Sequence, residues 1–271
     1  MNFKNAKYFP YILATLLLAI LYFMVQSEKT LQPFSARASF AQEPGYFYLP
    51  PGSADVSEVT AEQYRSLIAE FQMKYIMPVY KVTGKALLIP QEWESPYFAG
   101  FSIDRGNYMQ VSLWGGTARA HGANLVILAG ILCHEVGHII GGAPHQTIPG
   151  AEWSSSEGQS DFFAARECLP EFLKNHPELI PAPDEEALNK CDGNSLCART
   201  VSVGLQLVRF LQKYDSQKSA DVSLRAQAPA VKETLVNAYP SAQCRLDTYV
   251  KGAQCQLGGE CRPPACWIAE Q

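Results

Sequence analysis

The chain has 271 residues, a formal net charge of −4 and a hydrophobic content of 47%. This length and apolar content predict one globular domain with a substantial core. No basic run or stripe occurs, which argues against nucleic acid as a partner.

The N-terminal stretch has the pattern of an export signal. Lys4 and Lys7 precede the uncharged segment YILATLLLAILYFMV, residues 11–25. A short positive region followed by an apolar run predicts a signal peptide over residues 1–27 or a single N-terminal membrane anchor; the alternative is a buried core helix. With the lysines held inside, the rest of the chain is expected in a periplasmic or extracellular location.

Residues 28–56 are rich in Pro, Ser, Gly and Ala and are expected to form a linker or extended segment. The domain, residues 57–271, begins with a helix capped at Thr60, because Gln63 stands at the capping-box position. The buried face of this helix carries apolar residues at helical spacing, namely Leu67, Ile68, Phe71 and Tyr75. Pro78 is expected to end the helix.

A small antiparallel sheet is expected next. Residues 85–90 predict a short apolar strand, and residues 98–104 and 108–114 predict the two arms of a hairpin. The second arm alternates between apolar and mixed side chains, as in a sheet with one exposed face. Gly115 and Gly116 are expected to end that arm.

The rest of the chain predicts helices, so the fold class is a mostly helical α+β domain. Residues 124–140 are apolar on nearly every side, which is typical of a helix buried in a core. Gly141 and Gly142 supply its stop. A further helix starts near Ser155 and is kinked or ended by Pro170. Three more are predicted over residues 196–214, 231–239 and 241–252.

The eight cysteines are consistent with export, because an even number behind an export signal indicates disulfides. The sequence leaves their pairing open. Near-neighbour pairing would give the bridges Cys191–Cys197, Cys244–Cys255 and Cys261–Cys266. Cys133 and Cys168 would then form the fourth bridge. It would link the helix that carries the sequence HEVGH, residues 134–138, to the helix that follows it.

The sequence HEVGH lies near the end of the buried helix. His134 and His138 are four residues apart, so both imidazoles lie on one helix face and can hold one metal ion. Glu135 points about 100° away and can reach a water molecule on that ion. Two histidines and a glutamate would be costly to bury in an apolar helix without such a partner. The pattern predicts one Zn²⁺ ion, with Glu135 as the general base.

The third protein ligand has two candidates, because catalytic zinc takes three protein ligands and one water. In HExxHxxGxxH sites a third histidine follows the glycine. Gly141 stands at the glycine position, but Pro144 occupies the histidine position and His145 comes one residue late. Glu157 is therefore the favoured ligand.

Glu157 and Asp161 are four residues apart in a predicted helix and share one face. Glu157 would bind zinc, and Asp161 would accept the ring N–H of a zinc-bound histidine and fix its tautomer. The alternative is that Glu157 only stabilises a helix start, with Ser154 as the partner in a capping box. Asp161 would then be an exposed polar residue.

Together, His134, Glu135, His138, Glu157 and Asp161 resemble the motif residues of gluzincin (thermolysin-like) zinc peptidases, most closely the HtpX and CAAX-protease type. The segment YPSAQCR, residues 239–245, is similar to the His-Pro-Ser…Arg segment of that type, with a tyrosine in place of the histidine. The resemblance covers roughly residues 85–250. It implies a zincin-like peptidase domain in which strand 108–114 pairs with an extended substrate backbone.

Three function classes are open. The first is a zinc-dependent metalloendopeptidase that hydrolyses proteins or peptides outside the cytoplasm. Candidate donors to its transition-state oxygen are His145, His176, Tyr239 and Arg245. The second is a non-catalytic secreted module that binds a partner protein, for which the Cys-rich tail, residues 244–271, would supply a surface. The third is a zinc hydrolase of a non-peptide substrate. Glu135 favours an enzyme, because a binding module needs no general base.

Overall fold

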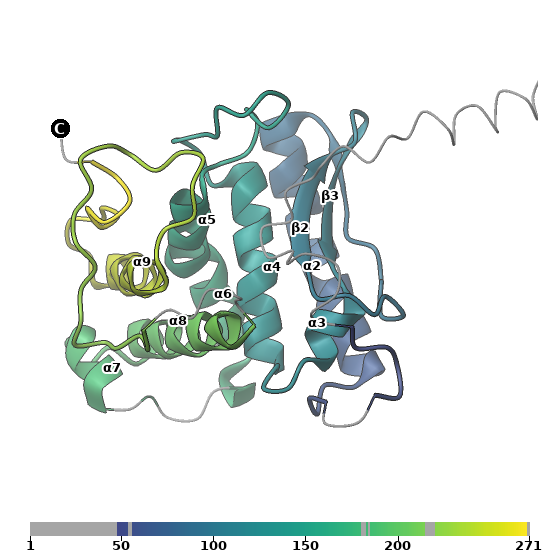
Figure 1. Ribbon diagram of the computed structural model, residues 1–271, viewed down its shortest axis with the longest axis horizontal. Coiled ribbons are helices and arrows are strands. Elements are labelled where there is room, and N and C mark those ends of the chain that lie inside the picture. The colour runs from purple at the N-terminus through teal and green to yellow at the C-terminus, as the bar shows by residue number, and fades with distance from the viewer. Residues whose placement is uncertain (1–47, 54–55, 180–182, 184, 215–219, 270–271) are drawn as a thin grey trace, which may run out of the picture. The chain divides into compact units, whose positions relative to one another are not determined.

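The fold is organised around the buried helix that the sequence predicted. The computed structural model describes residues 48–53, 56–179, 183, 185–214 and 220–269, so the predicted signal peptide or anchor lies outside the described residues. Helix α4 (Leu125–Ile140) runs through the middle, with a three-stranded sheet on one side and helices on the other (Figure 1). This arrangement confirms the mostly helical α+β class.

Helix α4 is buried along nearly its whole length. The Asn124 side chain caps its first turn by accepting a hydrogen bond from the Ile127 amide, and Gly141 follows its last residue. Gly137 lets the next helix come very close, because a Cβ at this position would lie 2.9 Å from the carbonyl oxygen of Ser160. The close approach brings side chains of that helix beside the two motif histidines.

Helix α2 (Ala61–Thr83) packs against α4 and carries the predicted capping box between Thr60 and Gln63. The expectation that Pro78 ends the helix is wrong, since the helix continues to Gly84, which has a φ of 70°. Val79 is fully buried and extends the apolar face beyond the proline. Packing of that face offsets the backbone hydrogen bond that a proline removes.

The predicted hairpin is confirmed. Strands β2 (Gly100–Asp104) and β3 (Tyr108–Leu113) pair in antiparallel fashion. Strand β1 (Ala86–Leu88) pairs with β3 in parallel, so the sheet is mixed rather than wholly antiparallel, in the order β1-β3-β2. The chain crosses the sheet after β1, which places β1 on the far side of β3. The short helix α3 (Gly115–Arg119) follows β3.

The central place of β3 corrects one expectation from the family resemblance. Strand β3 pairs with β2 along Met109–Leu113 and with β1 at Tyr108–Gln110, so it is the central strand of the sheet and not the expected edge strand. Within the described part of the chain, β2 has a partner on one side only, and it is the strand that lies alongside α4 (Figure 1). The open sheet edge at the motif helix therefore belongs to β2.

The chain stays helical past Pro170, where the sequence had predicted a kink or an end. The first part of this helical stretch is α5 (Glu157–Phe163). It passes through a π-helical turn, η2 (Ala164–Cys168), into α6 (Leu169–Asn175), where Pro170 occupies the first turn. A proline there removes no bond that the first turn needs. The carbonyl oxygen of Arg166, four residues earlier, accepts a 2.8 Å hydrogen bond from the Gln256 side chain instead.

The last three helices of the chain pack on one another, and the final one also packs against α5. After the turn η3 (Pro177–Leu179) come α7 (Glu185–Lys190), α8 (Ser195–Lys213) and α9 (Ala242–Gln254), followed by η4 (Cys255–Leu257). The predictions for α8 and α9 are confirmed. The helix expected over residues 231–239 is wrong, because the Val231 and Leu235 amides bond to the carbonyl oxygens of Ala265 and Trp267 rather than within a helix.

Four disulfides are present. The bridges Cys133–Cys168 and Cys191–Cys197 are confirmed, whereas the other two guesses are wrong: the pairs are Cys244–Cys266 and Cys255–Cys261. Cys244 and Cys255 lie at opposite ends of α9, about 16 Å apart at 1.5 Å per residue, and a disulfide needs Cα atoms within about 7 Å.

The disulfides indicate an oxidising, extracytoplasmic environment, since cysteines in the cytoplasm are kept reduced. Over the residues that the structure describes, no helix combines the length and the apolar character needed to cross a membrane.

Candidate metal centre

Three buried side chains converge at the junction of α4 and α5. One ligand atom from each of His134, His138 and Glu157 lies within 4.8 Å of the other two, and within the described ranges this is the only such group of His, Cys, Asp or Glu. Glu157 Oε2 is 3.2 Å from His134 Nε2 and 3.7 Å from His138 Nε2. The group could hold one metal ion.

The other ring nitrogen of each histidine is already bonded. His134 Nδ1 lies 2.7 Å from Asp161 Oδ1, and His138 Nδ1 lies 2.8 Å from the carbonyl oxygen of Ser155. These acceptors place the proton of each neutral imidazole on Nδ1. Each Nε2 then directs a lone pair towards Glu157, an arrangement that only a cation or a proton between them stabilises. Two imidazole nitrogens and one carboxylate form a ligand set of catalytic zinc.

Asp161 is fully buried, so the alternative prediction that it is an exposed polar residue is wrong. Arg245 holds it with two hydrogen bonds, from Nε to Oδ2 and from Nη2 to Oδ1, each 2.7 Å long. Burial alone would raise the pKa of the Asp161 carboxyl, but the charges of Arg245 and His134 keep it well below its usual range. Asp161 therefore remains ionised beside its histidine.

The charge on Asp161 also acts on His134. Burial alone would lower the pKa of His134, whereas the carboxylates of Asp161 and Glu157 raise it to about 9. Arg245 is only 7% exposed, and its Nε and Nη2 are bonded to Asp161. Its role in the fold is to neutralise Asp161.

Glu157 is the first residue of α5, but Ser154 does not cap this helix. Ser156 does so, by accepting from the Gln159 amide, and Ser154 instead lies 3.1 Å from His138 Nδ1. Burial would raise the pKa of Glu157, yet the nearby charges of His138, His134 and Arg245 lower it. A carboxylate that stays ionised while buried is suited to binding a cation.

Glu135 is fully buried beside the sheet. Ser102 Oγ on β2 lies 2.6 Å from the main-chain oxygen of Glu135 and 2.9 Å from its Oε2. Burial raises the pKa of the Glu135 carboxyl, against the lowering effect of His134 and His138. Ser102 could not be predicted as part of the site, because no local pattern pairs a strand residue with a residue on a later helix.

The other candidate donors lie in different places. His145 is exposed on the loop after α4, and His176 Nε2 is 3.0 Å from both carboxylate oxygens of Glu70. Tyr239 as a residue is 46% exposed, and its hydroxyl interacts with the Glu157 carboxylate. Burial, together with the charges of Glu157 and Glu135, raises the pKa of Tyr239, which keeps the phenol protonated.

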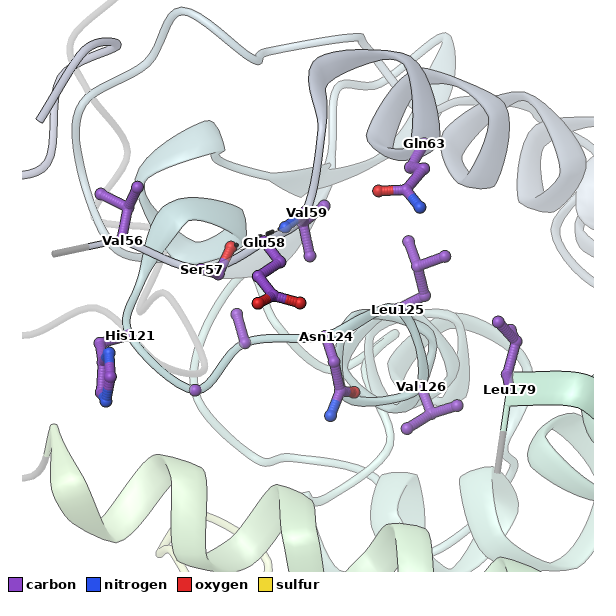
Figure 2. Close-up of a pocket in the computed structure, with 12 residues that line it drawn as sticks. Val56, Ser57, Glu58, Val59, Gln63, His121, Asn124, Leu125, Val126 and Leu179 are labelled. Carbon is purple, nitrogen blue, oxygen red and sulfur yellow. Dashed lines mark hydrogen bonds between the residues drawn. The ribbon is translucent and has the colours of Figure 1, made fainter. Parts of the chain in front are cut away.

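A cavity of about 480 Å³ lies at the other end of α4, beside Asn124 (Figure 2). The ionisable side chains that line it are Glu58 and His121, both exposed. Asn124 precedes His134 by ten residues, about 15 Å along the helix axis. With two possible ligands rather than three, this cavity is a weaker candidate than the buried group at the C-terminal half of α4.

Comparison of the chain with protein-family models, with curated proteins and with solved structures gave no match. The likeness to gluzincins therefore rests on the motif residues and on the geometry of the buried group, which fits an HExxH…E site of the zincin type.

Proposed function

We propose that the chain is a zinc-dependent metalloendopeptidase that acts outside the cytoplasm. The observation that carries this proposal is the convergence of His134 Nε2, His138 Nε2 and Glu157 Oε2 in a buried site, with both Nδ1 atoms held by acceptors. A zinc ion bound there would polarise a peptide carbonyl and lower the pKa of a water molecule.

Glu135 is the general base in this proposal. Its Oε2 accepts a hydrogen bond from Ser102, while its Oε1 lies towards Gly100 on β2. The raised pKa of Glu135 brings the carboxylate closer to the range in which it takes a proton from water and returns it to the leaving amine. Ser102 fixes the orientation of the carboxylate.

The substrate proposal starts from the hydrogen-bond pattern of the hairpin. Trp114 N donates to Ala99 O, and Arg105 N donates to Tyr108 O, each at 2.9 Å. Bonded pairs alternate along an antiparallel ladder. In β2 the odd-numbered residues therefore bond to β3, and the even-numbered residues direct their backbone groups towards the open edge.

Two of these even-numbered residues, Gly100 and Ser102, also face α4 with their side-chain positions. A Cβ at Gly100 would lie 2.7 Å from Ile131 and 3.5 Å from Glu135 Oε1. A peptide that adds to the edge of β2 would thus lie next to Glu135, with main-chain bonds providing affinity. This edge supports an extended protein segment rather than a non-peptide compound as substrate.

Tyr239 is the proposed donor to the oxygen of the transition state. Its hydroxyl interacts with Glu157, one residue of the metal group, and the charge of Glu135 also acts on it. A protonated phenol can donate to developing negative charge. Of the other three candidates from the sequence, His176 is bonded to Glu70 and Arg245 to Asp161, while His145 is exposed on the loop after α4.

The test is zinc content together with cleavage of an unfolded, reduced and alkylated protein. We expect one zinc per chain, and a loss of cleavage of at least about a hundredfold in Glu135→Gln with zinc retained. Glu58→Gln, at the other end of α4, is the matched control and should leave both unchanged. If Glu135→Gln binds zinc and cleaves as well as the wild type, Glu135 is not the base.

A further inference from the structure

The C-terminal segment of the described chain lies against the start of α5. We call residues 264–269 the clamp and residues 226–240 the strap. Leu235 N donates to Trp267 O at 2.8 Å, and Val231 N donates to Ala265 O at 2.9 Å, so strap and clamp are bonded to each other. The disulfide Cys244–Cys266 joins the clamp to α9.

Trp267 is fully buried and packs on the backbone of α5. A Cβ at Gly158 would lie only 2.2 Å from Trp267 Cδ2, far closer than van der Waals contact allows. Only glycine fits beneath this ring, and Gly158 directly follows Glu157. The first turn of α5, which carries the carboxylate of the metal group, therefore rests on the indole.

The contacts that hold the clamp belong to a small apolar cluster, separate from the main core. Its buried members are Phe162, Cys244, Cys266 and Trp267. Two strap residues, Ala228 and Leu235, pack against it. With so little apolar surface, the position of strap and clamp depends on the indole and on the disulfide that holds it.

The strap continues from this cluster to the metal group. Asn237 binds Thr147 on the loop after α4: its side-chain oxygen accepts from the Thr147 amide at 2.8 Å, and its amide donates to Thr147 Oγ1 at 2.6 Å. Two residues later the strap presents Tyr239 to Glu157. Both the carboxylate ligand and the proposed donor are thus attached to the cluster around Trp267.

We propose that Trp267 is a positioning residue for the metal group and that the Cys244–Cys266 bond holds it in place. In this proposal, which rests on the proposed function, the clamp orders the first turn of α5 from one side and the strap from the other. Loss of the indole or of the disulfide lowers metal affinity although neither touches a ligand atom.

The first experiment measures zinc affinity by competition with a chromogenic chelator, on the full chain. Trp267→Ala and the double variant Cys244→Ser/Cys266→Ser should each bind zinc about ten- to a hundredfold more weakly, the range seen when groups that orient ligands are lost. Cys191→Ser/Cys197→Ser removes a disulfide that belongs to a different apolar cluster and should bind as the wild type does. Phe210→Ala, a cavity in the main core, controls for general destabilisation.

Trp267→Phe separates positioning by the ring from any polar role. The indole Nε1 is buried and makes no hydrogen bond with the described residues, so a phenyl ring should restore most of the affinity. Gly158→Ala should weaken zinc binding by displacing the indole, yet add little in the Trp267→Ala background, because the ring is then absent. Equal zinc affinity in all folded variants would overturn the proposal.

Amide hydrogen exchange provides a readout that needs no metal. In Trp267→Ala, protection should fall in residues 157–161 and 235–239 while α8 stays protected. Unchanged exchange in these two segments contradicts the proposal, as does a uniform loss of protection, which would indicate a purely structural residue. If the wild type binds no zinc, the proposed function fails, whereas the exchange result still decides whether Trp267 orders this turn.

Discussion

The two histidines of the metal group are held in different ways. His134 Nδ1 faces the ionised Asp161, which Arg245 neutralises, whereas His138 Nδ1 faces the main-chain carbonyl of Ser155. Both acceptors fix the same tautomer, but only the first places charges in the interior. A buried ion pair is stable as a unit and costly when one partner is removed, while a carbonyl contributes a neutral hydrogen bond that no side-chain substitution deletes.

The largest expected effect is that of Asp161→Asn. It leaves the Arg245 charge buried without a carboxylate, so we expect a loss of about 3–5 kcal/mol in the free energy of unfolding, together with weaker zinc binding. Chemical denaturation and zinc competition measure the two effects.

The double variant Asp161→Asn/Arg245→Met sharpens this prediction. It contains no unpaired charge, so most of the stability should return, while zinc binding should stay weak because the charge that orients His134 is missing. Full recovery of zinc affinity would show that the ion pair is structural only.

The pH dependence of the metal-free protein gives an intermediate effect. The pKa of His134 is raised to about 9 in the folded state, against about 6.5 when unfolded. A raised pKa contributes stability that is complete below the unfolded value and is lost as pH rises through the folded value. The free energy of unfolding should therefore fall between about pH 6.5 and 9, by on the order of 3 kcal/mol.

Denaturation of the chelated protein at a series of pH values measures this loss, and Asp161→Asn should flatten the profile. A wild-type profile that is already flat across this window would contradict the assignment, because His134 would then not be coupled to Asp161.

The smallest effect is expected on the His138 side. Ser160 Oγ lies 2.9 Å from His138 Nδ1, in addition to the carbonyl of Ser155. Since the carbonyl remains in Ser160→Ala, we expect a loss of about 1 kcal/mol or less and nearly unchanged zinc affinity. A loss as large as that of Asp161→Asn would erase the difference between the two histidines.

The sequence predicted those parts of the site that depend on local periodicity. His134 and His138 share a face of α4, and Glu157 and Asp161 share a face of α5, as their four-residue spacing requires. The residues that it missed, such as Ser102, act across the fold, and their spacing carries no signal.

The errors in the fold have the same origin. The helix predicted over residues 231–239 fails because its amides bond to the clamp, and Pro78 is tolerated because Val79 is buried beyond it. In both places tertiary contacts outweigh local preference.

The close contact at Gly137 has a consequence for the choice of ion. Helices α4 and α5 meet there almost backbone to backbone, and Cys133–Cys168 ties α4 covalently to the turn that follows α5. The contact sets how closely the two helices approach, and the disulfide limits how far they can separate. A larger cation such as calcium, which takes six to eight oxygen ligands at about 2.3–2.6 Å, would have to push these helices apart. Ion selectivity would then be a property of helix packing as much as of the ligands themselves.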